Sequence, residues 1–80
     1  MRLPRDISGR ELVAALRRVG YLVTRQTGSH IRLTRSADVE HHVTVPDHSP
    51  IKLGTLNGIL RDVAEHVGMT RDELLDHLFR

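Results

Sequence analysis

Apolar residues recur at helical spacing in the first quarter of the chain. They form a stripe along residues 9–19, made of Leu12, Leu16 and Val19. Ser8 and Glu11 have the three-residue separation of a capping box, in which the two residues cap each other at the start of a helix. Gly20 follows the stripe, at a position where glycine commonly ends a helix. The pattern therefore predicts a helix over residues 9–19.

Three stretches typical of β-strands come next. Residues 21–26 begin with aromatic and β-branched side chains but do not show which face is buried. In residues 31–35 and 41–45 polar side chains alternate with apolar ones, which are Ile31, Leu33, Val43 and Val45. Pro46 ends the third strand because it has no N–H to donate. Residues 34–38 predict a polar loop, and the short connections predict antiparallel neighbours.

Two further helices are expected after a connection that contains two prolines. The first has a helical stripe, made of Leu56, Ile59, Leu60, Val63 and Val67, and Gly68 ends it. Thr70 and Glu73 form a second capping box. The order α-β-β-β-α-α predicts an α+β fold for a single domain over residues 1–80. Helices packed on one face of its three-stranded antiparallel sheet would leave the other face open to a partner.

The net charge of +2 conceals an uneven distribution along the chain. Residues 1–37 have a net charge of +6 and residues 38–80 a net charge of −4. All but one of the basic residues are arginines, whose planar group binds phosphate through two hydrogen bonds. The basic half therefore predicts a phosphate-binding face.

Composition excludes several classes of protein. Tyr21 and Phe79 are the only aromatic residues, too few for a platform on which RNA bases stack. The chain has no cysteine for a disulfide or a thiolate metal site, which fits a cytoplasmic protein. It also lacks an apolar run long enough for a signal peptide or a membrane span, so we expect no membrane association.

The sequence Gly28-Ser29-His30 separates the first two predicted strands. A hairpin turn exposes its side chains, so we expect His30 to be accessible. Histidine gives and takes protons near neutral pH, which suits general acid–base catalysis. Four arginines close in sequence would attract a polyanion to it: Arg18, Arg25, Arg32 and Arg35.

RNA cleavage needs little machinery beyond such a histidine. The 2′-hydroxyl of RNA is a nucleophile for the adjacent phosphate, so a protein needs one proton-transfer group and cations that stabilise the phosphate charge. His30 could supply the first, with Arg32 on the same strand face. Lys52 or His48, from the later loop, could complete the set.

Two other chemistries are disfavoured by the spacing. Three imidazoles for a metal could come from His41, His42 and His48, but neighbouring strand residues point to opposite faces of a sheet. A serine hydrolase would need a nucleophile elbow, which the chain lacks around Ser29. We therefore expect no metal and no serine nucleophile.

The ordered motifs of the chain resemble the HicA family, small mRNA-cleaving toxins of bacterial HicA–HicB toxin–antitoxin pairs. They cover residues 7–68 and comprise Ser8-Gly9-Arg10-Glu11, Gly20-Tyr21, Arg25-Gln26-Thr27-Gly28-Ser29-His30, Val43-Thr44-Val45-Pro46-Asp47-His48 and Lys52-Leu53-Gly54-Thr55-Leu56-Asn57-Gly58-Ile59-Leu60. Each motif alone is weak, and their order and spacing make the resemblance specific.

The resemblance implies a fold like that of the double-stranded-RNA-binding domain, α-β-β-β-α, with the helix after Gly68 as an extension. It also implies metal-independent cleavage of mRNA, without a cofactor, by His30. Gly28 and Ser29 would form the turn that positions His30. The residues expected to contact RNA are Gly28, Ser29, Arg32, Lys52 and His48. A HicB-like antitoxin would bind and inhibit the protein.

Two alternatives stay open at this point. A non-catalytic RNA-binding module of the same fold would use the arginines, with His30 as a hydrogen-bond donor. A protein-interaction domain would show no salt-dependent affinity for RNA.

Overall fold

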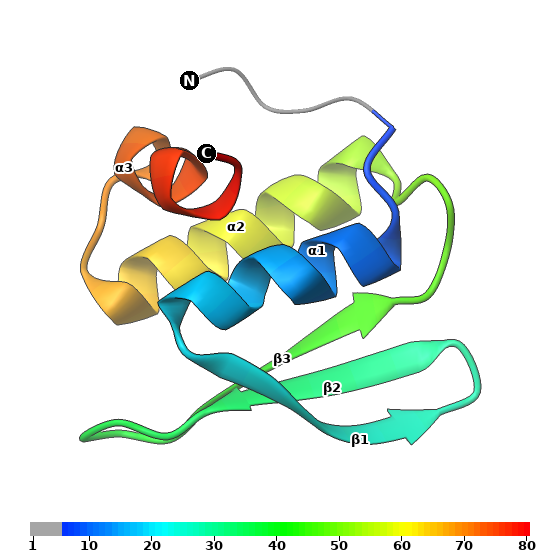
Figure 1. Cartoon of the computed structure of the whole chain (residues 1–80), viewed down its shortest axis with the longest axis horizontal. Helices are drawn as coiled ribbons and strands as arrows, with labels where there is room; N and C mark the ends of the chain where they lie inside the picture. The colour runs from blue at the N-terminus through cyan, green and yellow to red at the C-terminus, as the bar shows by residue number, and fades with distance from the viewer. Residues whose placement is uncertain (1–5) are drawn as a thin grey trace.

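The computed structural model describes residues 6–80 and has two layers (Figure 1). The helical layer contains α1 (Gly9–Leu16), a 3₁₀ turn η1 (Arg17–Val19), α2 (Leu53–Val67) and α3 (Arg71–Leu78). The antiparallel sheet has the strand order β1 (Tyr21–Thr27), β2 (His30–Arg35) and β3 (His41–Pro46). Helices α1 and α2 cover one face of the sheet, and α3 packs against α2 and η1 on the far side of this layer. The predicted α+β fold is confirmed.

Both predicted capping boxes are present. The Ser8 hydroxyl accepts a hydrogen bond of 3.1 Å from the Glu11 backbone N–H, and the Glu11 carboxylate accepts one of 3.0 Å from the N–H of Ser8. Thr70 and Glu73 make the same pair of bonds at 3.1 and 2.9 Å. These bonds satisfy N–H groups that would otherwise lack a partner at the helix start.

The first helix tightens before it ends. The sequence predicts one helix over residues 9–19, whereas the structure has an α-helix to Leu16 and the 3₁₀ turn over the last three residues. Gly20 ends it with a φ of 94°, and its N–H donates to the Arg17 carbonyl at 3.1 Å. Glycine occupies this left-handed region without steric cost, so the chain can reverse directly into β1.

The sequence predicts both a strand over residues 31–35 and a polar loop over residues 34–38, and the loop prediction is wrong at the two shared residues. Thr34 and Arg35 belong to β2, and Thr34 is buried. The Thr34 hydroxyl lies 2.8 Å from the Thr24 hydroxyl and 2.7 Å from Nδ1 of His42, so side chains on both neighbouring strands satisfy it. Nε of Arg35 donates to the Val19 carbonyl at 2.8 Å. These partners, on the neighbouring strands and in the 3₁₀ turn, keep two polar residues in a strand where local composition favours a loop.

A β-bulge in β1 explains why its sequence does not show a buried face. The pairing with β2 shifts between Val23 and Arg25, so Thr24 is the extra residue. Thr24 bonds to Thr34 on the face away from the helices, and Arg25 pairs with Arg32 on that same face. Two consecutive side chains therefore point the same way, and the period-2 alternation is broken in the middle of the strand.

The apolar core lies between the helices and the sheet. The predicted stripes of α1 and α2 face the alternate apolar residues of β2 and β3, and α3 adds its own leucines to the same cluster. The fully buried large side chains are Tyr21, Leu12, Leu16, Leu33, Leu56, Leu60, Leu74, Leu75, Val45 and Val63. The opposite face of the sheet is not covered by any element of the described chain, residues 6–80. We call it the open face.

A polar cluster lies on the helix side of the sheet, at the end of β2 far from His30. The Tyr21 hydroxyl is 2.6 Å from Nδ1 of His41, whose Nε2 is 3.2 Å from the Asp62 carboxylate. A carboxylate only accepts hydrogen bonds, so Nε2 of His41 carries a proton whether the ring is neutral or charged, and in the neutral ring Nδ1 accepts from Tyr21. The His66 ring stacks on His41 at 4.2 Å between centroids, and its buried Nε2 has no partner among the described residues.

Burial raises the pKa of Tyr21 to about 12, so its hydroxyl stays protonated as the donor to His41. Burial also lowers the pKa of His66, and the charges of His41 and Arg35 lower it further, against the opposing charge of Asp62. The unfolded chain therefore binds a proton at His66 more readily than the folded protein does.

Acid should consequently destabilise the protein through His66. We expect this contribution to stability to be complete above the unfolded pKa near 6.5 and to decline as the pH falls below it. The measurement is the free energy of unfolding in urea between pH 5 and 8. His66→Phe should flatten the pH dependence, whereas His77→Gln, at an exposed position of α3, should leave it as in the wild type. Equal slopes for wild type and His66→Phe would contradict the prediction.

Candidate functional site

The predicted hairpin exists, and His30 lies just after its turn rather than on it. Gly28 and Ser29 make the turn, with a φ of 56° at Gly28 that glycine adopts without strain. His30 is the first residue of the central strand β2, paired with Thr27 of β1 and Pro46 of β3. Its side chain is exposed, as predicted. Pairing with strands on both sides fixes the backbone of His30.

Arg32 lies two residues along β2 from His30, so both side chains lie on the open face. Arg25 of β1 and Thr44 of β3 flank Arg32 in the sheet register. Both arginines are exposed, and neither forms an ion pair within the described part of the chain. The predicted sharing of one face by His30 and Arg32 is confirmed.

The four arginines near His30 in sequence divide into two kinds. Arg35 donates to a backbone carbonyl on the helix side of the sheet, and Nη1 of Arg18 donates to the carbonyl of Arg80 at 3.2 Å. Arg25 and Arg32 have no such bond among the described residues and extend over the open face. Only these two place charge beside His30.

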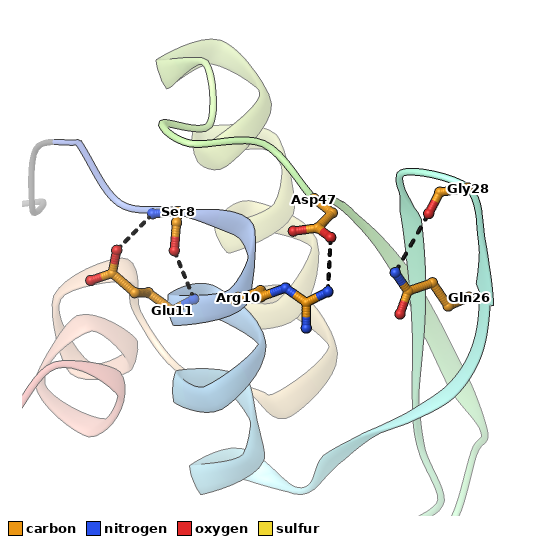
Figure 2. Close-up of polar contacts among 6 residues, drawn as sticks. All are labelled: Ser8, Arg10, Glu11, Gln26, Gly28 and Asp47. Carbon is orange, nitrogen blue, oxygen red and sulfur yellow. Dashed lines mark hydrogen bonds and ion pairs between the residues drawn. The ribbon is translucent and has the colours of Figure 1, made fainter.

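Asp47 ties the hairpin turn to the first helix (Figure 2). Its N–H donates to the Ser29 carbonyl at 2.7 Å, and its carboxylate accepts a 3.1 Å bond from Nη2 of Arg10. A longer contact of 3.5 Å runs from the Gln26 amide to the Gly28 carbonyl across the turn. The residue before His30 is therefore held by its backbone.

The same end of the molecule brings the start of α1 against the chain leaving β3 (Figure 1). The Gly9 N–H donates to the His48 carbonyl at 2.9 Å, and the Ile51 N–H donates to the Ile7 carbonyl at 2.8 Å. A Cβ on Gly9 would lie 2.1 Å from the Pro46 carbonyl oxygen, so only glycine fits. His48 anchors this loop through its backbone, and its side chain is exposed.

Lys52 precedes α2 as its exposed N-cap residue, without a side-chain capping bond. It belongs to the helical layer, beyond the loop that starts at Asp47. Within residues 6–80, no hydrogen bond or ion pair joins the side chains of Lys52, His48 and His30. The structure thus brings His30 and Arg32 onto one face, and places Lys52 and His48 at the same end of the molecule without direct contact.

The two adjacent histidines point to opposite faces, as predicted. His41 faces the helices, whereas His42 faces away, with Nδ1 near Thr34 and Nε2 3.3 Å from the Glu40 carboxylate. Among residues 6–80 no group of three potential ligands, counting His, Cys, Asp and Glu, could hold a metal ion. In the same part of the chain, no helix has both the length and the apolar composition to cross a membrane.

Comparison with known proteins adds one finding. A family model, described as the HicA toxin of bacterial toxin–antitoxin, matches residues 9–64, which is more than half of the chain. The chain belongs to the HicA toxin family. The HicA match runs from α1 into α2, so it includes His30, Asp47 and Lys52 and leaves α3 outside. Neither the curated proteins nor the solved structures contained a match.

The close approach at Gly9 can be tested by adding a single methyl group. Gly9→Ala should destabilise the protein by about 1–3 kcal/mol, because the obstructing atom belongs to the backbone and cannot rotate away. Gly58→Ala is the matched control: its Cβ would meet nothing within 4 Å, and alanine in a helix stabilises by up to ~1 kcal/mol. Urea unfolding of both variants measures the difference, and equal effects would contradict the assignment.

Proposed function

We propose that the protein is a metal-independent endoribonuclease that cleaves mRNA in the cytoplasm and needs no cofactor. Its membership of the HicA family makes it a toxin of a bacterial toxin–antitoxin system. The observation that carries the proposal is the exposed imidazole of His30 on the open face, next to the guanidinium of Arg32, which forms no ion pair with any residue from 6 to 80. This arrangement supplies a proton-transfer group and a phosphate-binding cation side by side.

In the proposed reaction, the 2′-oxygen of a ribose forms a bond to the adjacent phosphorus, and the bond from phosphorus to the 5′-oxygen breaks. His30 accepts the proton of the 2′-hydroxyl and returns it to the leaving 5′-oxygen, directly or through water. The products are a 2′,3′-cyclic phosphate and a free 5′-hydroxyl, so no water is consumed in this step. Arg32 binds the RNA backbone beside the reacting phosphate, and its positive charge favours the negative charge that builds there.

The remaining site residues position His30 or bind RNA. Gly28 and Ser29 place His30, because the Ser29 carbonyl is bonded to the loop after β3. His48 and Lys52 are exposed in and just after the loop whose first residue bonds to Ser29, and there they contact the RNA strand as it leaves the open face. A HicB-like antitoxin binds the toxin and inhibits it.

His30→Ala tests the catalytic role. We expect cleavage of a fluorescent RNA to fall by about 10²–10⁴-fold. Binding of the same sequence with 2′-O-methyl sugars, which cannot be cleaved, should be unchanged. His77→Ala, which changes an exposed histidine on α3, should cleave like the wild type.

Two further experiments test whether cleavage is independent of metal and requires the 2′-hydroxyl. Cleavage should persist in EDTA, and a single 2′-deoxy sugar at the cut site should block it. Activity that EDTA abolishes would overturn the metal-independent mechanism. A wild-type protein that binds RNA and never cuts it would instead be a non-catalytic RNA-binding module.

The antitoxin can be tested in cells. Expression of the wild type should arrest growth, and expression of His30→Ala at equal abundance should not. Co-expression of the product of the adjacent gene should restore growth and should co-purify with the toxin. Arrest by the His30→Ala variant would argue against RNA cleavage as the cause of toxicity.

A further inference from the structure

The bulge in β1 turns Arg25 toward the open face. Strict alternation from buried Tyr21 would direct Arg25 toward the helices, but the extra residue Thr24 reverses the order. Arg25 then stands directly opposite Arg32, and the next residue, Gln26, lines a hollow against α1. Bulges commonly re-aim side chains next to functional sites.

This pairing places two positive charges opposite each other without compensation. Like charges in a cross-strand pair destabilise a sheet. No acidic residue stands in the sheet rows of His30 and Arg32, and the two acids that flank β3 form ion pairs with other residues: Glu40 with His42, and Asp47 with Arg10. Arg25 and Arg32 therefore form a positively charged site on the open face, two residues along β2 from His30. An anion bound there would neutralise this charge.

We propose that Arg25 and Arg32 together bind one backbone phosphate of single-stranded RNA, next to the phosphate cleaved at His30. This inference rests on the proposed function. His30 and Arg32 are about 7 Å apart along the strand, a step that one nucleotide of an extended RNA can span. Two guanidinium groups can each donate paired hydrogen bonds to a phosphate. The RNA strand would then follow β2 across the open face.

The chemistry of this face also limits what it recognises. Neither of the two aromatic residues lies on it: Tyr21 is buried, and Phe79 packs against the helical core. Bases therefore have no platform to stack on, and the subsite holds RNA through its phosphates alone. We expect binding there to depend steeply on salt and to be indifferent to the base.

The test uses a short 2′-O-methyl oligoribonucleotide and the variants Arg25→Gln, Arg32→Gln and Arg61→Gln. Each of the first two should weaken binding about 10-fold and lower the slope of log affinity against log salt by about 1. The double variant should lose less than the product of the single losses, since both groups hold one phosphate. Arg61→Gln removes an exposed arginine from α2, outside the open face, and should bind within twofold of the wild type.

Thermal unfolding separates binding from folding. Arg25→Gln should raise the melting temperature or leave it unchanged, because it removes a repulsion. A lower melting temperature together with weaker binding would mark Arg25 as structural and would overturn the proposal, as would an effect equal to that of Arg61→Gln. Arginine-dependent binding of polyglutamate but not of RNA would also overturn it, in favour of an acidic protein partner.

Failure of the phosphate site and failure of the proposed nuclease activity would give different results. Arg25→Gln should lose more cleavage at low RNA concentration than at saturating RNA, whereas His30→Ala loses cleavage at both. If the wild type never cleaves RNA but the salt slope still depends on Arg25 and Arg32, the nuclease assignment fails and the phosphate site stands.

Discussion

The contact of Gly9 with the chain leaving β3 is the constraint on which this structure depends. The helix starts so close to the Pro46 carbonyl that no side chain fits between them, and the Gly9 N–H is bonded to the His48 carbonyl. Asp47 lies between Pro46 and His48 in the chain, and its N–H donates to the Ser29 carbonyl. One close approach thus links the first helix, the third strand and the hairpin turn, so the position of His30 depends on residues distant in sequence.

The elements set by local chemistry could be predicted from the sequence. Capping boxes at Ser8 and Thr70 depend on residues three positions away, and alternation in β2 and β3 depends on residues two positions away. Features that local chemistry leaves undecided depend on distant partners. Thr34 is compatible with a buried strand only because Thr24 and His42 satisfy its hydroxyl, and their positions follow from strand pairing.

The candidate site also combines residues that local sequence predicts with residues whose roles depend on distant contacts. His30 and Arg32 were found because a turn motif and a two-residue period define them. The bond between Arg10 and Asp47 spans 37 residues, and no local pattern signals it, although a basic residue in the first turn of a helix, where acids are favoured, is a hint. Arg25 was noted for its charge alone, since its orientation depends on the bulge.

The bulge gives β1 a property that its neighbours lack. Side chains in a strand alternate between the two faces of the sheet. The extra residue Thr24 shifts this alternation by one position for the residues that follow it, which form the outer half of β1. Tyr21, which precedes the bulge, stays buried in the core, whereas the residues after Thr24 follow the shifted alternation. Without this shift, strict alternation from Tyr21 would place Gln26 rather than Arg25 on the open face. The bulge therefore decides which side chain of the outer half meets an anion, while the residues before it keep the alternation that the core requires.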